Sequence, residues 1–306
     1  MSKKFEPIYI GLILLAFIWA FNNIGSKIIS DYLPPFTAGA FRFALASIVL
    51  VAFMLIMRVR IPVLELRDWL MLVWLSFVGM LLLNYAFFVS FPYTLVSETY
   101  IIVGLNPVLM FVFSVIFIGE KWHWAKFAGV LLAFSGVAVA FYHPDIIHST
   151  HLWGDFLFSL SVVAWVVYSI SMKGLLKRVS PIIVTVYTSV IGTIMLAAAA
   201  FVIEKPLADV PRVLALPDLS HLLIALLYVG IIATAVAYIL WSEAVARVGP
   251  STSAVFIALV PPLGVVFSSL LLHEPLYHNL LFGLGFIIAG IILTTRDYST
   301  KTVKGD

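Results

Sequence analysis

The sequence contains no cysteine among its 306 residues. A disulfide framework and any cysteine-based metal or redox site are therefore excluded. Charged residues are also scarce, at 11% of the chain against roughly 25% in an average soluble domain. Hydrophobic residues make up 63% and the mean hydropathy is +1.12, so almost nothing is left over for a soluble domain.

Acidic residues are missing from the middle of every long apolar run. Four glutamates lie near the ends of such runs, namely Glu98, Glu120, Glu243 and Glu274. A buried carboxylate relay of the kind found in many proton pumps is therefore not visible. The chain also lacks a GxxxxGK[ST] phosphate-binding loop, so direct coupling to ATP hydrolysis is unsupported.

The histidines give no sign of a metal or catalytic site. His143, His148 and His151 cluster with Asp145 in one predicted loop, but their spacing fits no standard zinc pattern. No set of His, Asp and Glu shares a deep helix face, as a membrane-embedded enzyme would need. We expect no catalytic residues, no metal and no cofactor.

Long apolar runs dominate what is present. Runs of about 20 residues are typical of helices that cross the hydrocarbon layer, which is roughly 30 Å thick. We mark ten of them, at 7–29, 36–57, 69–90, 95–118, 125–142, 152–172, 181–203, 220–241, 251–272 and 279–296. The first follows MSKKFEP, has the length of a full span and lacks a small-residue cleavage site, so we expect an uncleaved helix. The sequence predicts an all-α integral membrane protein with ten transmembrane helices.

Basic residues show how these helices are oriented. With the N-terminus inside, 14 of the 18 Lys and Arg residues fall inside, three fall outside and Arg42 lies within a span. This bias predicts that both termini are cytoplasmic. The net charge of +3 then reflects orientation in the lipid bilayer, and we expect no nucleic-acid partner.

The two halves of the chain resemble each other. Residues 97–140 match residues 251–294 at ten of 44 positions with an offset of 154, and an offset of 146 pairs Trp19 with Trp165 and Lys27 with Lys173. We divide the chain into a first repeat at 1–146 and a second at 147–306. Each repeat has five spans, and because five is odd, the second is inverted relative to the first. Secondary transporters often have this architecture, with a central cavity between the repeats near the membrane midplane.

Prolines interrupt the fourth span and its counterpart, the ninth. Pro107 lies in LNPVLMFVFSVIFIGE, and Pro261 and Pro262 lie in LVPPLGVVFSSLLLHE. A proline lacks an N–H group, so it leaves the carbonyl four residues earlier without its usual partner. Free backbone acceptors at membrane depth are tolerated only inside protein or beside a watery cavity. We predict that these prolines break helices and serve gating, although a kink needed only for packing would leave the same pattern.

Polar and aromatic side chains at helical spacing mark the candidate substrate site. Trp19, Asn22, Asn23 and Lys27 share one face of the first span, and Trp165 and Tyr168 lie at related positions in the sixth. Polar side chains are costly in lipid and usually face an interior cavity. The full predicted substrate-binding set is Trp19, Asn22, Asn23, Lys27, Arg42, Asn84, Phe88, Asn106, Trp165, Tyr168, Tyr238 and Trp241.

Arg42 is the most deeply placed cation, about 9 Å inside the second span at 1.5 Å per residue. It would either pair with Asp31 as a structural contact or attract an anionic group of the substrate, such as a carboxylate. Lysines near span ends often extend to lipid headgroups. We expect this of Lys173, whereas Lys27 is expected to face the cavity.

Glycines recur at seven-residue spacing in the last span of each half, at Gly129 and Gly136 and at Gly283 and Gly290. Small residues allow close helix packing. This packing could lie within or between subunits, so monomer and homodimer both remain open.

The chain resembles the drug/metabolite transporter superfamily, in particular its EamA-like branch, in which two EamA repeats form ten spans. The resemblance is carried by AFIWAFNNIGSKII, LPPFTAGAFRFALASI, LNPVLMFVFSVIFIGEKW and TAVAYILWSEAVARVGPSTSAVFIALVPPLGVVFSSLLLHEPL. It implies a bundle around a central cavity that exports small metabolites, often amino acids, across a bacterial or archaeal inner membrane. Within the superfamily the chain is most similar to YddG-type exporters of aromatic amino acids.

The leading prediction is therefore a secondary transporter that exports small metabolites, amino acids above all, by alternating access. The alternatives are a transporter of another class, such as a drug-like cation, a nucleoside or a sugar phosphate, or a passive channel. A sugar phosphate would demand more intramembrane cations than Lys27 and Arg42 provide. A channel would show flux without saturation or counterflow.

Overall fold

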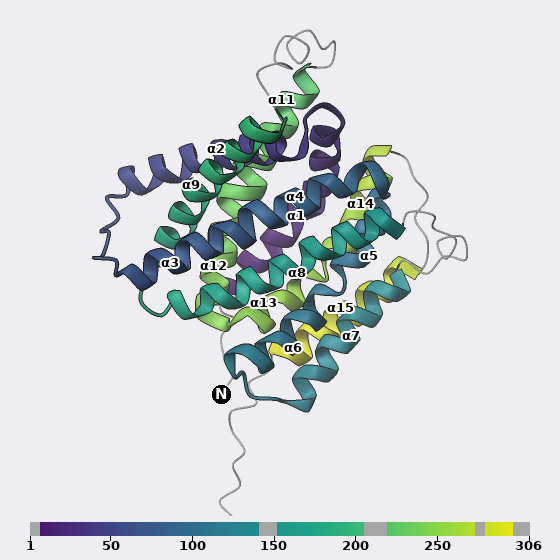
Figure 1. The fold of residues 1–306 in the computed structure, drawn as a ribbon. Helices are drawn as coiled ribbons and strands as arrows, with labels where there is room; N and C mark the ends of the chain where they lie inside the picture. The colour runs from purple at the N-terminus through teal and green to yellow at the C-terminus, as the bar shows by residue number, and fades with distance from the viewer. Residues whose placement is uncertain (1–6, 141–151, 205–218, 273–278, 296–306) are drawn as a thin grey trace, which may run out of the picture.

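The computed structural model describes residues 7–140, 152–204, 219–272 and 279–295, and the regular structure in these ranges is helical (Figure 1). Seven helical stretches in this part of the chain are long and apolar enough to cross a membrane. Three shorter apolar helices overlap the other three predicted spans, namely Trp124–Val139, Pro250–Gly264 and Leu281–Thr295. The prediction of an all-α membrane protein is confirmed.

The first repeat contains five spans, two of them built from several helical pieces. Its elements are α1 (Pro7–Tyr32), α2 (Pro35–Ile56), α3 (Leu66–Ser76), the π-helix η1 (Phe77–Leu82), α4 (Leu83–Ser90), the 3₁₀ turn η2 (Phe91–Tyr93), α5 (Val96–Val103), α6 (Asn106–Ile118) and α7 (Trp124–Ala140). Both α2 and its counterpart α9 begin with a proline, which suits the first turn of a helix because no N–H is needed there.

The second repeat follows the same plan. Its elements are α8 (Leu152–Leu175), α9 (Pro181–Ala199), the π-helix η4 (Ala200–Glu204), α11 (Leu219–Leu227), the π-helix η6 (Tyr228–Val236), α12 (Ala237–Val248), α13 (Pro250–Ile257), α14 (Val260–Leu272) and α15 (Asn279–Thr295). The predicted boundary between residues 146 and 147 lies outside the described residues and stays a prediction.

Irregular features recur at the offset found in the sequence. The fourth span breaks between Val103 and Asn106, and the ninth breaks between Ile257 and Val260, 154 residues later. The π-helices η1 and η6 end at Leu82 and Val236, again 154 residues apart. Because these departures from α-helical geometry fall at equivalent positions, the two halves share one fold as well as a sequence pattern.

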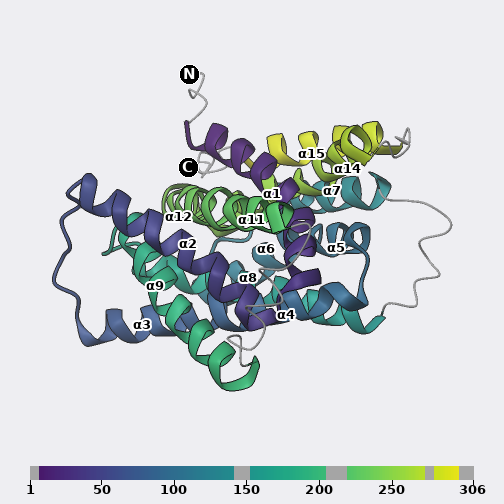
Figure 2. The ribbon, with the colours of Figure 1, turned by 90° about the horizontal axis from the view of Figure 1, so that it is seen from above.

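The packing of the helices is symmetric between the repeats. Helix α2 lies beside its counterpart α9, and α7 lies beside its counterpart α15 (Figures 1 and 2). The pair of α1 with α12 corresponds to the pair of α8 with α4. If the two repeats are exchanged, the pairs α2–α9 and α7–α15 map onto themselves, and the pair α1–α12 maps onto the pair α8–α4. A pseudo-twofold axis between the repeats requires this pattern.

Glycines hold α7 and α15 at close range. A Cβ atom added to Gly129 would lie 2.9 Å from the carbonyl oxygen of Gly290, and one added to Gly136 would lie 2.6 Å from that of Gly283. The earlier glycine of one helix thus faces the later glycine of the other, so these equivalent helices run antiparallel. This seam joins the repeats within one subunit and agrees with their inversion.

Candidate functional site

A cavity of about 100 Å³ lies where the two repeats meet. A single water molecule needs about 10–15 Å³, so the cavity has room for several. Residues from both repeats line it: Trp19, Asn22, Asn23, Arg42, Leu83, Phe87, Val103, Asn106, Phe158, Ser161, Val162, Trp165, Tyr238, Ile257 and Val260.

Several lining residues are equivalent between the repeats. Trp19 and Trp165 correspond at the offset of 146, and Val103 and Ile257 correspond at 154. Both helix breaks therefore reach the cavity. Position 107 and position 261 are prolines, so neither donates an N–H to the carbonyl of Val103 or Ile257. The predicted breaks are present, whereas a gating role for Pro107, Pro261 and Pro262 stays a prediction.

The structure brings seven of the twelve predicted site residues into the cavity lining. These are Trp19, Asn22, Asn23, Arg42, Asn106, Trp165 and Tyr238. The remaining five lie behind the lining or away from it. Their roles in binding stay predictions.

Packed indole rings form one wall. The ring of Trp165 lies 5.1 Å from that of Trp19 and 5.1 Å from that of Trp241, measured between centroids. Trp241 is fully buried behind the lining and donates from Nε1 to the Ser169 hydroxyl at 3.0 Å. Tyr168 lies behind the same wall, 5.6 Å from the Trp165 ring. The wall is therefore rigid and apolar towards the cavity.

Arg42 enters the cavity from α2 and is held by residues of both repeats. Its Nε donates to the Thr234 hydroxyl at 2.7 Å, and Nη1 donates to Asn84 Oδ1 at 3.4 Å. Asn84 is fully buried and donates in turn to the carbonyl of Met80 at 2.9 Å. Asn84 thus orients Arg42 from behind the lining, at the junction of η1 and α4.

Asparagine side chains supply the other polar groups. Asn23 donates to the Thr99 hydroxyl at 3.0 Å, and Asn22 donates weakly to Asn23 at 3.4 Å. The Oδ1 atoms of Asn22 and Asn106 are buried, and neither accepts a hydrogen bond within the described part of the chain. Buried polar atoms without a partner are rare in folded proteins, so these two oxygens leave hydrogen-bonding capacity unused beside the cavity.

Lys27 and Phe88 do not line the cavity. Lys27 pairs with Asp31 of its own helix at 2.8 Å, and its side chain is 35% exposed. The alternative in which Asp31 pairs with Arg42 is likewise not seen. Phe88 is buried against Phe87 and Phe91. The helical stripe that starts at Trp19 points into the cavity at first, but it leaves the cavity before it reaches Lys27.

The sequence reasoning missed some residues of the lining. Phe87, Phe158 and Ser161 contribute to it, and Thr234 anchors Arg42. Ser161 precedes Trp165 by one helical turn, so an extension of the predicted stripe towards the start of α8 would have found it. Phe158 precedes Ser161 by three residues and Phe87 follows the predicted Asn84 by three, so helical spacing could also have indicated both positions.

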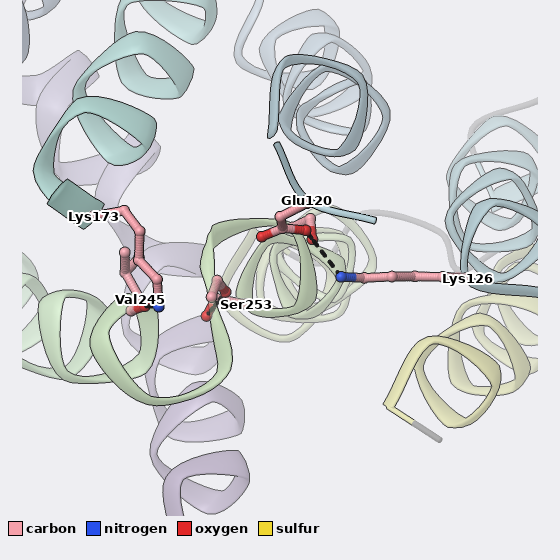
Figure 3. A network of polar contacts seen from close by, with 7 residues as sticks. Glu120, Lys126, Lys173, Val245 and Ser253 are labelled. Carbon is pink, nitrogen blue, oxygen red and sulfur yellow. Dashed lines mark hydrogen bonds and ion pairs between the residues drawn. The ribbon is translucent and has the colours of Figure 1, made fainter. Parts of the chain in front are cut away.

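Polar contacts tie several helices together at the end of the bundle where α13 begins (Figure 3). Glu120, just after α6, accepts hydrogen bonds from Lys126 at 3.1 Å and from the Ser251 hydroxyl. Lys173, near the end of α8, donates to the carbonyls of Val245 and Ala246 at 2.8 and 3.1 Å. The contact between Glu120 and Ser251 joins the end of the first repeat's fourth span to the second repeat, whereas the contacts of Lys173 lie within the second repeat.

The two broken spans differ in how tightly they are enclosed. All eight residues of α13 are buried. In the equivalent helix α5, four residues are partly exposed, namely Val96, Ile101, Ile102 and Val103. Helix α13 is therefore enclosed more tightly than its counterpart α5.

Comparisons with known proteins agree with this architecture. The chain is 26% identical to the uncharacterized transporter YetK of Bacillus subtilis over 96% of this chain and 88% of that protein. A probable terminal-alkyne amino-acid exporter of Streptantibioticus cattleyicolor is 27% identical over 64% of this chain and 63% of its own. A solved crystal structure matches with a TM-score of 0.73 and 18% identity, covering 94% of this chain and 96% of that one, which shows the fold alone.

A family model adds the decisive match. The model of the EamA-like transporter family, part of the drug/metabolite transporter superfamily, matches residues 7–142 and again residues 152–296. These two matches cover nearly all of the chain, in agreement with the repeated breaks and π-helices. The chain belongs to the EamA-like transporter family.

Proposed function

We propose that this multi-pass membrane transporter is a secondary exporter of small metabolites, above all amino acids including aromatic ones, working by alternating access between its inverted repeats. The observation that carries the proposal is the cavity shared by both repeats, where both broken helices meet. A site at such an interface would be reached from one side or the other as the repeats rock against each other.

The chemistry of the lining supports an amphipathic substrate. Trp19, Trp165 and Phe158 provide an apolar wall, while Arg42, Asn22 and Asn106 provide polar groups. Small-molecule sites typically combine such walls with a few placed polar groups that orient the ligand. An aromatic or aliphatic amino acid has an apolar side chain that suits the apolar wall and a polar end that suits the polar groups.

The comparisons support the same substrate class and direction. The relative from Streptantibioticus cattleyicolor is named an exporter of amino acids. We propose transport in place of catalysis because the family and the relatives are named transporters. The bias of Lys and Arg further supports both termini in the cytoplasm, and the family resemblance implies the inner (cytoplasmic) membrane.

Counterflow of labelled phenylalanine and leucine in proteoliposomes tests this function. We expect saturable counterflow with the intact chain and a large loss in Trp19→Ala and Asn84→Ala, because one removes the apolar wall and the other the support of Arg42. Trp153→Ala, at a ring that is exposed on the outside of the bundle, is the matched control. Unchanged counterflow in both test variants would discard this site.

The alternatives predict different results in the same vesicles. A passive channel would give flux that does not saturate and shows no counterflow. A transporter of another metabolite class would leave amino acids untouched. Untargeted metabolomics on overexpressing and deletion cells would then identify the compounds whose export depends on the protein.

A further inference from the structure

We infer that Arg42 is the receptor for a carboxylate group of the transported molecule. This inference rests on the proposed transport function and narrows its substrate class. It selects metabolites with a free carboxylate, such as zwitterionic amino acids, over amines, nucleosides and other compounds that lack an anionic group.

The first observation is a buried cation without a counter-ion. The side chain of Arg42 is 4% exposed and lies within a transmembrane span. It forms no ion pair with any residue in the described ranges; Asp31, the nearest acidic candidate by sequence, pairs with Lys27. A guanidinium remains charged in proteins, and an uncompensated charge in a membrane interior is costly. An anionic ligand would supply the missing charge.

The second observation is that the guanidinium has unused donors. An arginine side chain carries five N–H donors. Arg42 uses one for Thr234 and one for Asn84, so three have no protein partner among the described residues. The remaining donors sit on the two terminal nitrogens, which form a planar fork that matches the two oxygens of a carboxylate.

The third observation is that the guanidinium is fixed before any ligand arrives. Thr234 belongs to η6 and itself donates to the carbonyl of Val229 at 2.7 Å. Asn84 follows η1 and is anchored at Met80. Phe87 lies 5.8 Å from the guanidinium carbon, so an aromatic face covers part of the group. A preorganised donor loses little freedom on binding.

The simpler explanation is that Arg42 only joins α2 to η6. Two neutral contacts, to a hydroxyl and to an amide oxygen, would account for that role without a charge. A neutral side chain with one or two donors would then serve equally well. The two explanations differ in whether the positive charge matters to ligands, and this can be measured.

Benzoate and benzamide form a suitable probe pair, because they have nearly the same size and shape but only benzoate carries a carboxylate. Binding to the full chain in detergent would be followed by tryptophan fluorescence, since Trp19 and Trp165 line the cavity, and by the thermal unfolding midpoint. We expect benzoate to bind roughly tenfold more tightly than benzamide, as a charge-assisted hydrogen bond allows. The preference should vanish in Arg42→Gln and persist in the surface control Arg247→Gln.

Asn84→Asp keeps the test decisive should Arg42→Gln fail to fold. The new carboxylate would lie next to the guanidinium and act as a built-in counter-ion, so the preference for benzoate should disappear although Arg42 is retained. Equal binding of benzoate and benzamide to the unaltered chain, or no binding of either, would overturn the inference. A preference for benzoate in a protein that moves no amino acid would instead uphold the anion site and reject amino acids as the substrate.

Discussion

Lys27 and Lys173 occupy equivalent positions in the two repeats but make different contacts. Lys173 donates to two carbonyls at the end of α12, where a helix leaves its last acceptors unsatisfied. Lys27 makes an ion pair on the surface with Asp31, four residues along its own helix. Position in the repeat therefore does not determine the role of a side chain.

We predict that Lys173→Met destabilises the protein by about 1 kcal/mol, because two partly buried carbonyl acceptors lose their donor. These carbonyls lie at the C-terminal end of α12, where the helix dipole favours a positive charge. Lys27→Met should change stability far less, since exposed ion pairs contribute little. Thermal unfolding of both variants in the same detergent provides the comparison. Equal changes in the unfolding midpoint of the two variants would show that the contacts of Lys173 stabilise the protein no more than the surface ion pair of Lys27 does.

Individual site residues were predictable only in part. The stripe from Trp19 to Asn23 was found by helical spacing, and the structure places it at the cavity. The same spacing wrongly suggested a cavity position for Lys27, because a stripe fixes the face of a helix but not how far along its axis the cavity extends. The contact of Arg42 with Thr234 was not foreseeable, since Thr234 lies 192 residues away in the sequence.

At the scale of helices, the seam between α7 and α15 depends on the absence of side chains. We predict that Gly136→Ala lowers the free energy of unfolding by about 1–3 kcal/mol, as expected when a methyl group is forced into a packed contact. The new Cβ would lie 2.6 Å from a backbone oxygen that cannot move aside easily.

Gly285→Ala on α15 is the matched control for this seam. A Cβ at Gly285 meets no atom within 4 Å. The control should retain or slightly gain stability, because alanine favours a helix more than glycine does. Thermal unfolding of both variants decides the matter, and a stable Gly136→Ala protein would show that the helices can separate at no cost.

The helix breaks were predictable and the π-helices were not. A proline in an apolar run removes a known N–H, so the breaks before Pro107 and Pro261 follow from the sequence. The π-helices η1 and η6 arise in runs such as FVGMLL, whose composition is the same as that of ordinary spans. At η1 the side chain of Asn84 donates to the carbonyl of Met80 four residues earlier, a local contact that the composition of the run does not reveal.

At the scale of the whole molecule, the inversion of the repeats governs which loops share a face of the membrane. Position 60 follows the second span, and position 206 follows the seventh, its counterpart. We predict that a cysteine at Arg60 and a cysteine at Pro206 react with impermeant reagents from opposite sides of the membrane. Reaction of both from the same side would contradict the inverted architecture and, with it, the proposed mechanism.

The fold as a whole was easier to predict than the differences in burial between its two repeats. Ten apolar runs and a repeat of five determine an inverted bundle, and the structure and family confirm it. The unequal enclosure of α5 and α13 was not predictable, because equivalent segments in the sequence give no indication of which one is more exposed.

That inequality turns the lack of native cysteine into an experimental advantage. Ile102 on α5 is partly exposed, whereas its counterpart Phe256 on α13 is 2% exposed. In a background without other thiols, a cysteine at position 102 should be alkylated quickly and one at position 256 slowly. A compound that reverses this order would stabilise a second conformation of the protein, and the two alkylation rates would then report the change between conformations without a transport assay.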